Sequence, residues 1–444
     1  MSDDFLTREQ TENYGRYVAE PNEVQLARYF HLDERDLAFI NQRRGKHNRL
    51  GIALQLTTAR FLGTFLPDPL QIPSFIRFYI AAQLNISRPE ILSRYAEREN
   101  TRWEHQGLIK LYYDYHDFGD FPWTFRLKRL LYTRAWLSNE RPGLLFDFAT
   151  AWLLQNKILL PAASTLTRLI GEVRERASRR LWRRLALLPD SWQKAQLDGL
   201  LEIPEGQRIS VLEEIRKGPV TISGPSFTDA LERYTRLRSM EFSRLNFSGL
   251  PAIQLRNLAR YAGMASVKYI SRMPEERRLA VLTAFVKAQE ISALDEAVDV
   301  LDMLILDITR SAKSIGQKKR LRTLKDLDRA ALLLARACSL LLDENTDEAA
   351  LRQAIFRRIP KDKLAESVGK VNELARPQDT HFQDEMVEQY GRVKRFLSAM
   401  LRDLHFQAAP AGEHTLSAIH YLAELSGSKK RILDDAPEQI ISGP

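Results

Sequence analysis

Residues 279–308 read LAVLTAFVKAQEISALDEAVDVLDMLILDI. Apolar side chains recur in this segment at steps of three and four residues, which is the spacing of one buried face of an α-helix. Elsewhere good helix formers dominate, and no run of strict alternation persists. The sequence therefore predicts an all-α protein with a long helix that begins near Met273. The apolar residues expected on its buried face are Leu279, Leu282, Val286, Leu294, Val298, Leu301, Ile305 and Ile308.

Shorter helices are expected upstream of this long helix. They cover about 72–84, 88–98 and 102–112, and the turns between them are only a few residues long. Asp33 is a good cap for an earlier helix. Short helices joined by tight turns are what a helix-turn-helix unit requires, although an ordinary helical bundle has the same pattern. The fold class is therefore several helical domains with helix-turn-helix-like units, followed by a long-helix bundle region.

Composition excludes several classes of protein. The chain has 444 residues, of which 44% are hydrophobic, so it can bury a sizeable core and is not disordered throughout. Cys338 is the only cysteine, which excludes an intrachain disulfide scaffold and favours a reducing compartment. No apolar run is long enough to cross a bilayer, and the first ten residues lack the pattern of a signal peptide. We expect a cytoplasmic protein with no membrane contact.

The charge is positive and clustered. The chain has 66 Lys and Arg against 57 Asp and Glu, a formal net charge of +9. Basic residues gather at 41–60, at 168–184 and at 310–325, and the first and third segments contain no acid. A polyanion held by such clusters would release counterions on binding. Solvated helix faces are the alternative for any single cluster, but three clusters together favour nucleic acid.

The first cluster contains a turn that leads into a helix. The segment RRGKHNRLG at 43–51 places Arg and Lys at the expected start of that helix, where the macrodipole disfavours cations. An anion would compensate for this placement, and backbone N–H groups at the helix start would also point towards it. A DNA phosphate is such an anion, and Arg and Asn side chains can also read base edges.

A metal site is the alternative that the acidic residues offer. Asp295, Asp299 and Asp302 lie four and three residues apart, so they share one face of a helix and could together bind Mg²⁺. A solvated acidic stripe has the same spacing. Magnesium sites usually take their ligands from separate elements, so the stripe is the preferred interpretation and a Mg²⁺-dependent nuclease is the lesser one.

Three breaks suggest the domain organisation. The segment LPDP at 66–69 ends the helix that carries Arg60, the segment 206–225 is rich in Pro and Gly, and 408–412 is a third break. The expected parts are N-terminal helical DNA-binding domains at 1–158, with a possible sub-boundary near 67–73, and a basic helical connector at 159–205. A linker at 206–226 and a helical middle or dimerisation region at 227–444 follow.

Several short motifs, in order along nearly the whole chain, resemble the Tn-three family of replicative transposases. They are QRRG at 42–45, HNRLG at 47–51, ALQL at 53–56, RFLG at 60–63, FLPDP at 65–69, YAERE at 95–99, LPA at 160–162, SR at 243–244, LARY at 258–261 and KKRLR at 318–322.

The resemblance implies a function. In this family, N-terminal helical domains bind the terminal inverted repeats of the transposon, and a middle helical region helps to pair two transposase molecules. A C-terminal RNase-H-like domain carries an Asp-Asp-Glu triad that holds Mg²⁺. The present sequence ends at Pro444, before such a domain would begin. We therefore expect this chain alone to be non-catalytic and without a cofactor, either as a fragment of a transposase or as a truncated DNA-binding protein that interferes with full-length subunits.

The expected partners are double-stranded DNA at the transposon ends and, in the full-length complex, a second copy of the chain. The expected location is the bacterial cytoplasm, at the nucleoid. No catalytic or metal-binding residue is expected. The candidate DNA-contacting residues are Arg43, Arg44, Lys46, His47, Asn48, Arg49, Arg60, Arg126, Lys128, Arg129, Arg174, Arg179, Arg180, Arg183, Arg184, Lys318, Lys319, Arg320 and Arg322.

Overall fold

The prediction of an all-α protein is confirmed. In the computed structural model, the described residues form helices and no β-strand, with one isolated parallel bridge between His116 and Ile158. The described residues are 5–97, 99–342, 351–374 and 383–426. They belong to two compact units, the first of which comprises 1–190 and 246–285, and the second 191–245 and 286–444.

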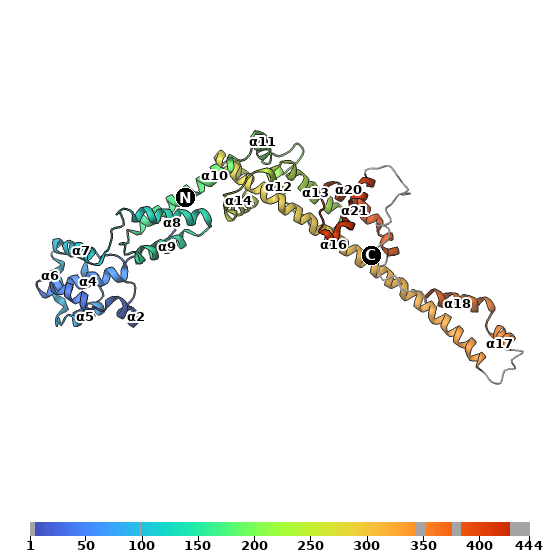
Figure 1. Cartoon of the computed structure of the whole chain (residues 1–444), viewed down its shortest axis with the longest axis horizontal. Helices are drawn as coiled ribbons and strands as arrows, with labels where there is room; N and C mark the ends of the chain where they lie inside the picture. Colours follow the sequence, from blue (N-terminus) through green and yellow to red (C-terminus); the bar gives the residue numbers. More distant parts are fainter. Residues whose placement is uncertain (1–4, 98, 343–350, 375–382, 427–444) are drawn as a thin grey trace. The chain divides into compact units, whose positions relative to one another are not determined.

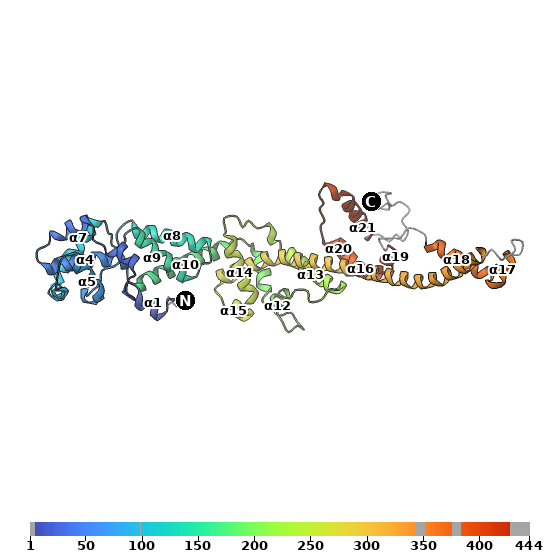
Figure 2. The ribbon, with the colours of Figure 1, turned by 90° about the horizontal axis from the view of Figure 1, so that it is seen from below.

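The first unit begins with a group of short helices around one central helix, α4 (Lys46–Leu62) (Figure 1, Figure 2). Every residue of α4 from Leu50 to Ala59 is buried, as expected for a helix that is covered on all sides. The surrounding helices are α2 (Glu23–Gln25), a π-helix (Leu26–Phe30), α3 (Glu34–Asn41), α5 (Ser74–Gln83), α6 (Leu92–Ala96) and α7 (Glu99–Tyr113), with 3-10 turns at Pro69–Gln71 and Pro89–Ile91. The first helix, α1 (Arg8–Asn13), lies apart from this group, because Leu6 and Tyr14 at its two ends pack against the core of the next three helices.

The short helices predicted from the sequence are present. The range 72–84 corresponds to α5, the range 88–98 to the second 3-10 turn and α6, and the range 102–112 to α7. Asp33 caps α3 as predicted, because its carboxylate accepts a hydrogen bond from the N–H of Asp36 at 2.7 Å. The helix that carries Arg60 ends at Leu62, where Gly63 adopts a left-handed conformation, before the Pro-rich segment begins.

Three further helices of the first unit lie side by side (Figure 1, Figure 2). They share a core that includes Leu127 and Leu131 from the first of them, Leu153 from the second and Leu166 from the third. A smaller cluster joins Leu181 and Leu185 to residues of the segment 246–285. The three helices are α8 (Trp123–Leu137), α9 (Pro142–Gln155) and α10 (Ala163–Ala186), and the segment 246–285 contains α14 (Ala252–Met264) and α15 (Val267–Ser271).

The second unit is built from helices on both sides of the Pro- and Gly-rich segment. Its main core packs Phe227 of α13 against Phe396 of α20 and against one face of α16. The helices are α11 (Ser191–Gly199), α12 (Val211–Ile215), α13 (Gly224–Ser239), α16 (Glu275–Leu341, of which residues from 286 on belong to this unit), α17 (Leu351–Arg358), α18 (Lys361–Leu374), α19 (Gln383–Glu388), α20 (Tyr390–Asp403) and α21 (Glu413–Ser426), with 3-10 turns at Phe242–Arg244 and Pro410–Gly412.

The long helix predicted from residues 279–308 is α16, which has 67 residues. Its expected apolar face is only partly correct. Leu279, Leu282, Val286, Leu301 and Ile308 are buried and Leu294 is half-buried, but Val298 and Ile305 are exposed. In the second unit, the buried face of α16 consists of Ala297, Val300, Leu301, Leu304 and Ile308 instead, and Val298 and Ile305 lie beside that face.

The structural units differ in outline from the expected domains. The first unit extends to residue 190 and also includes 246–285, so its chain is discontinuous in sequence. The segment 206–226 contains α12, and Pro225 lies in the first turn of α13. Proline and glycine therefore mark helix boundaries in this segment.

Candidate nucleic-acid interface

The first basic cluster forms the turn between α3 and α4. Gly45 is the N-cap residue of α4, with φ of +82°, a conformation that favours glycine. A Cβ atom at this position would also lie only 2.9 Å from the ring of His47. No side chain caps the first turn of α4, so its N–H groups are available to a ligand.

The side chains around this turn have different roles. Arg44 and Lys46 are exposed, and neither has an ion-pair partner among the described residues. Arg49 turns back onto the chain, where its guanidinium donates to the carbonyl oxygens of Arg43 at 3.0 Å and Asn41 at 3.3 Å. The amide of Asn48 donates to the carbonyl of Arg44 at 2.9 Å. Asn48 and Arg49 therefore hold the turn that presents Arg44 and Lys46.

Arg43 and His47 are half-buried in the same region. The guanidinium of Arg43 lies 5.4 Å from the centre of the Phe39 ring, and its Nε atom is buried without a hydrogen-bond partner among the described residues. Burial, together with the positive charge of Arg43, lowers the pKa of His105 on α7 to about 4. That imidazole is therefore neutral at pH 7, and the described residues provide no ion-pair partner for Arg43.

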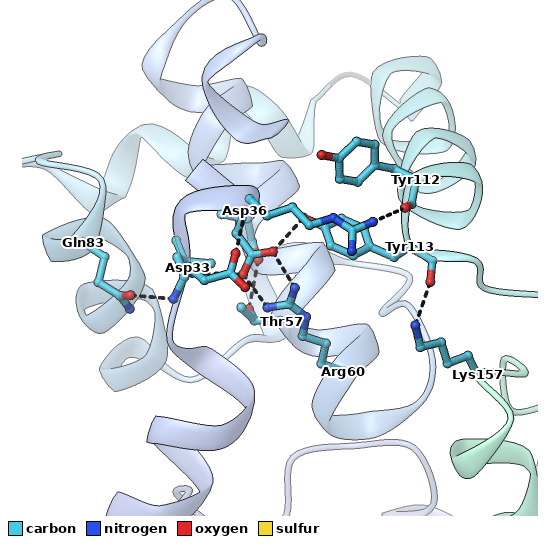
Figure 3. Close-up of polar contacts among 11 residues, drawn as sticks. Asp33, Asp36, Thr57, Arg60, Gln83, Tyr112, Tyr113 and Lys157 are labelled. Carbon is cyan, nitrogen blue, oxygen red and sulfur yellow. Dashed lines mark hydrogen bonds and ion pairs between the residues drawn. The ribbon is translucent and has the colours of Figure 1, made fainter. Parts of the chain in front are cut away.

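Arg60, the last member of the first cluster, is bonded within the unit (Figure 3). Its guanidinium donates two hydrogen bonds to the carboxylate of Asp36, at 2.7 and 2.5 Å. The hydroxyl of Tyr113 donates a third to the same carboxylate, at 2.7 Å. The side chain of Asp36 is 1% exposed and that of Arg60 23%. Arg60 therefore joins α4 to α3 and α7 inside the unit.

The electrostatics of this pair favour the charged forms. Burial by itself would raise the pKa of Asp36, but the hydrogen bonds from Arg60 and Tyr113 and the charge of Arg60 outweigh it and lower that pKa. Burial and the bond to Asp36 raise the pKa of the Tyr113 hydroxyl, which therefore remains a donor. Asp36, Arg60 and Tyr113 come from three separate helices. Their contacts therefore could not be predicted from a local sequence pattern.

A second basic surface lies on α8. Arg126, Lys128 and Arg129 are exposed, and the described residues provide no ion-pair partner for any of them. The guanidinium of Arg126 lies 5.1 Å from the centre of the Trp123 ring. Phe121, just before the helix, and Phe125, within it, are also exposed. The surface therefore combines cations with aromatic rings.

The arginines of α10 are less free than a sequence cluster suggests. Arg179 pairs with Glu175 at 2.5 Å, and Arg183 lies 3.9 Å from Glu276. Arg184 donates to the carbonyl of Gly249 at 3.0 Å. Arg174 is half-buried, and burial lowers the pKa of its guanidinium. The contacts of Arg183 and Arg184 tie α10 to the segment 246–285 of the first unit, whereas the Arg179–Glu175 pair lies within α10 itself.

Arg180 is the α10 residue that joins the surface of α8. Its guanidinium donates to the hydroxyl of Tyr132 at 3.1 Å and lies 5.1 Å from the centre of the Trp136 ring. Both aromatic residues belong to α8. The exposed side chain of Arg180 therefore extends the positive charge of α8 along its C-terminal half.

The third cluster lies on α16 in the second unit. Lys318 and Arg322 are exposed. Lys319 pairs with Glu388 at 2.6 Å and with Glu385 at 3.2 Å, and these contacts raise its pKa. The side chain of Arg320 lies outside the described residues. The cluster thus has at least one member that is already neutralised by the chain itself.

The three aspartates of the acidic stripe lie in the middle of α16. Asp295, Asp299 and Asp302 are exposed on α16. Within the described residues, no group of three or more His, Cys, Asp or Glu side chains is placed to hold a metal ion. The structure therefore gives no support to a Mg²⁺-dependent nuclease built on these aspartates.

Residues 5–173 match a family described as a domain of unknown function, DUF4158. Over 444 residues the chain is 78% identical to the transposase for transposon gamma-delta of Escherichia coli (strain K12), which covers 100% of this chain and 44% of that protein. This chain belongs to the Tn-three family of transposases. It is 28% identical over 429 residues to the transposase for transposon Tn501 of Pseudomonas aeruginosa, with 96% of this chain and 43% of that protein aligned.

The chain thus spans less than half the length of these Tn-three family relatives. The α3–α4 turn and all of α8 lie within the residues that the family model matches. Among the described helices, none is both long and apolar enough to span a membrane.

Proposed function

We propose that this chain binds double-stranded DNA at the terminal inverted repeats of a transposon, as the DNA-recognition part of a transposase. The relatives named above are transposases, and a transposase acts on DNA. We further propose that the chain acts in the bacterial cytoplasm, on nucleoid DNA, and that two copies pair when each holds one transposon end.

The α3–α4 turn is the observation that carries this proposal. It presents two exposed cations, Arg44 and Lys46, beside the uncapped N-terminus of a 17-residue helix. Arg43 beside them is half-buried and has no ion-pair partner among the described residues, so its positive charge adds to the attraction for a phosphate. Because the middle of α4 is buried, only its first turn can meet DNA, and we expect that turn to contact the backbone first.

The α8 surface provides the second group of contacts in the proposal. Arg126, Lys128 and Arg129 are exposed, and Arg180 of α10 stands beside them. Each cation that neutralises a phosphate releases counterions, so the affinity should fall steeply as salt rises. In this proposal Asn48 and Arg49 hold the turn and Arg60 holds α4 to α3 and α7, and none of the three touches DNA. Their substitution would therefore act mainly through folding.

A salt titration tests the turn. The full 444-residue chain is titrated against a duplex that carries the inverted repeat and against a scrambled duplex, at several salt concentrations. Arg44→Ala and Lys46→Ala should each weaken binding and reduce the log–log salt slope by about 0.9 per lost phosphate contact. Arg43 is a poorer choice for this test, because it also packs on Phe39.

Lys268→Ala is the matched control, because Lys268 is an exposed lysine of the same unit on α15, away from both basic surfaces. It removes one positive charge and should leave the salt slope nearly unchanged. Equal affinity for the two duplexes would overturn recognition of the inverted repeat. An unchanged slope in both turn variants would overturn the role of the α3–α4 turn.

A further inference from the structure

One face of α8 carries both aromatic and basic residues, because Phe125, Arg129, Tyr132 and Trp136 are four, three and four residues apart. Phe125 and Arg129 are exposed, whereas Tyr132 and Trp136 further along the face are half-buried and pack towards α10. Phe121 precedes this face. Phe121 is 88% exposed and Phe125 is 62% exposed. Two large apolar rings are therefore kept in water at one end of a basic helix face, where they have no role in the core.

The charge around these rings is positive. Phe121 to Asn139 contains no acid. The acids that flank this segment are already bonded within the chain, because Asp120 accepts the N–H of Asp117 at 2.9 Å and Glu140 pairs with Arg134 at 2.8 Å. This face can therefore attract an anionic partner, because the segment from Phe121 to Asn139 has no carboxylate that would repel it.

The chemistry of the face selects nucleic acid over protein. A protein-docking patch is usually depleted of charge at its centre, whereas Arg126, Lys128 and Arg129 immediately adjoin Phe125 here. Phosphates match the cations, and base faces match the aromatic rings. Proteins that place apolar side chains against DNA base steps use this combination, with cations on the flanking backbone.

We propose that Phe125, assisted by Phe121, wedges against a base step of the DNA bound by α8 and locally unstacks it. Arg126, Lys128 and Arg129 hold the phosphates beside that step, and Arg180 continues the backbone contact along the helix. The inference rests on the proposed function and deepens it, because it assigns to the same DNA interface a distortion of the duplex in addition to attachment.

Fluorescence of 2-aminopurine tests the wedge. The full chain is mixed with inverted-repeat duplexes that carry 2-aminopurine at successive positions. The wild-type chain should raise the fluorescence at one step, because an unstacked base is less quenched. The double variant Phe121→Ala/Phe125→Ala should abolish that rise and weaken binding about fivefold or more. Both rings are exposed, so its thermal unfolding should match that of the wild type, which calorimetry checks.

Phe78→Ala is the matched control, because Phe78 is 56% exposed on α5 in the same unit. It should preserve both affinity and fluorescence. Wild-type binding with no fluorescence rise at any position, or a rise that survives in the double variant, overturns the wedge and leaves the proposed function intact. Failure of the wild type to bind the duplex overturns both. A double variant that keeps its DNA behaviour but loses a protein partner reassigns the face to protein docking.

Discussion

At the scale of single residues, the structure divides one basic cluster into different tasks. Arg44 and Lys46 face solvent, Arg49 bonds to carbonyls at the end of α3, and Arg60 is paired with Asp36. The contact of Arg60 is internal, because two hydrogen bonds hold its guanidinium to the buried carboxylate of Asp36. A cation with a partner of this kind gains little from a phosphate, because it would first have to leave an already favourable site.

Removing one partner of this pair should destabilise the first unit. Asp36→Asn leaves the guanidinium of Arg60 without its counter-charge, and we expect a loss of about 3 kcal/mol in unfolding free energy, near the lower end for a buried pair because Arg60 keeps some solvent contact. Tyr113→Phe removes one bond to the carboxylate and should cost about 1.5 kcal/mol. Urea unfolding measures both values.

A variant at an exposed pair provides the comparison for this prediction. Glu12→Gln disrupts the exposed pair between Arg8 and Glu12 and should change the unfolding free energy by less than about 0.5 kcal/mol. If Asp36→Asn were equally mild, the network at Arg60 would not be a stabilising one, and Arg60 would return to the set of possible DNA contacts.

At the scale of elements, α4 organises the N-terminal group because other helices cover it on every side. α4 and α6 approach each other closely at Gly51, because glycine has no Cβ atom. A Cβ atom at this position would lie 2.3 Å from the ring of Tyr95. Tyr95 is fully buried, and its hydroxyl lies 3.0 Å from Nδ1 of His105 on α7. The ring therefore cannot move aside without disturbing the contact between α6 and α7.

Gly51→Ala should therefore destabilise the first unit by about 1–3 kcal/mol, the usual cost of overpacking a core. Gly107→Ala is the matched control on α7, because a Cβ atom there meets no atom within 4 Å. That substitution should stabilise its helix by up to about 1 kcal/mol. Thermal unfolding of the two variants should therefore shift in opposite directions, and a shift in the same direction would contradict the packing described for α4.

At the scale of the whole molecule, the chain comprises two compact units and spans less than half the length of its transposase relatives. The proposed DNA contacts use side-chain cations and backbone N–H groups. Neither kind of contact needs a metal ion, and the described residues contain no cluster that would hold one.

DNA binding by this chain should therefore survive removal of divalent metal. A titration against the inverted-repeat duplex in EDTA should give the same affinity as one in Mg²⁺, once the ionic strength is matched, because Mg²⁺ also competes for phosphates. Loss of binding in EDTA that is restored by Mg²⁺ at constant ionic strength would show instead that a metal ion belongs to the interface.

Much of this organisation follows from local sequence. Periodic apolar residues predict α16, short-range caps predict α3, and Pro and Gly mark the ends of α4 and the start of α13. The acid-free turn before α4 and the basic stretch of α8 are also visible in the sequence. These features depend on residues within one or two helical turns of each other, so the sequence by itself determined them.

The partners of individual side chains were decided only by the tertiary structure. Arg60 meets Asp36 and Tyr113 because α3, α4 and α7 pack together, and Val298 is exposed because α13 and α20 cover a neighbouring face of α16. Likewise, Phe125 and Arg180 belong to one surface only because α8 lies against α10. Such contacts join residues far apart in the chain, and periodicity contains no information about which helices will meet.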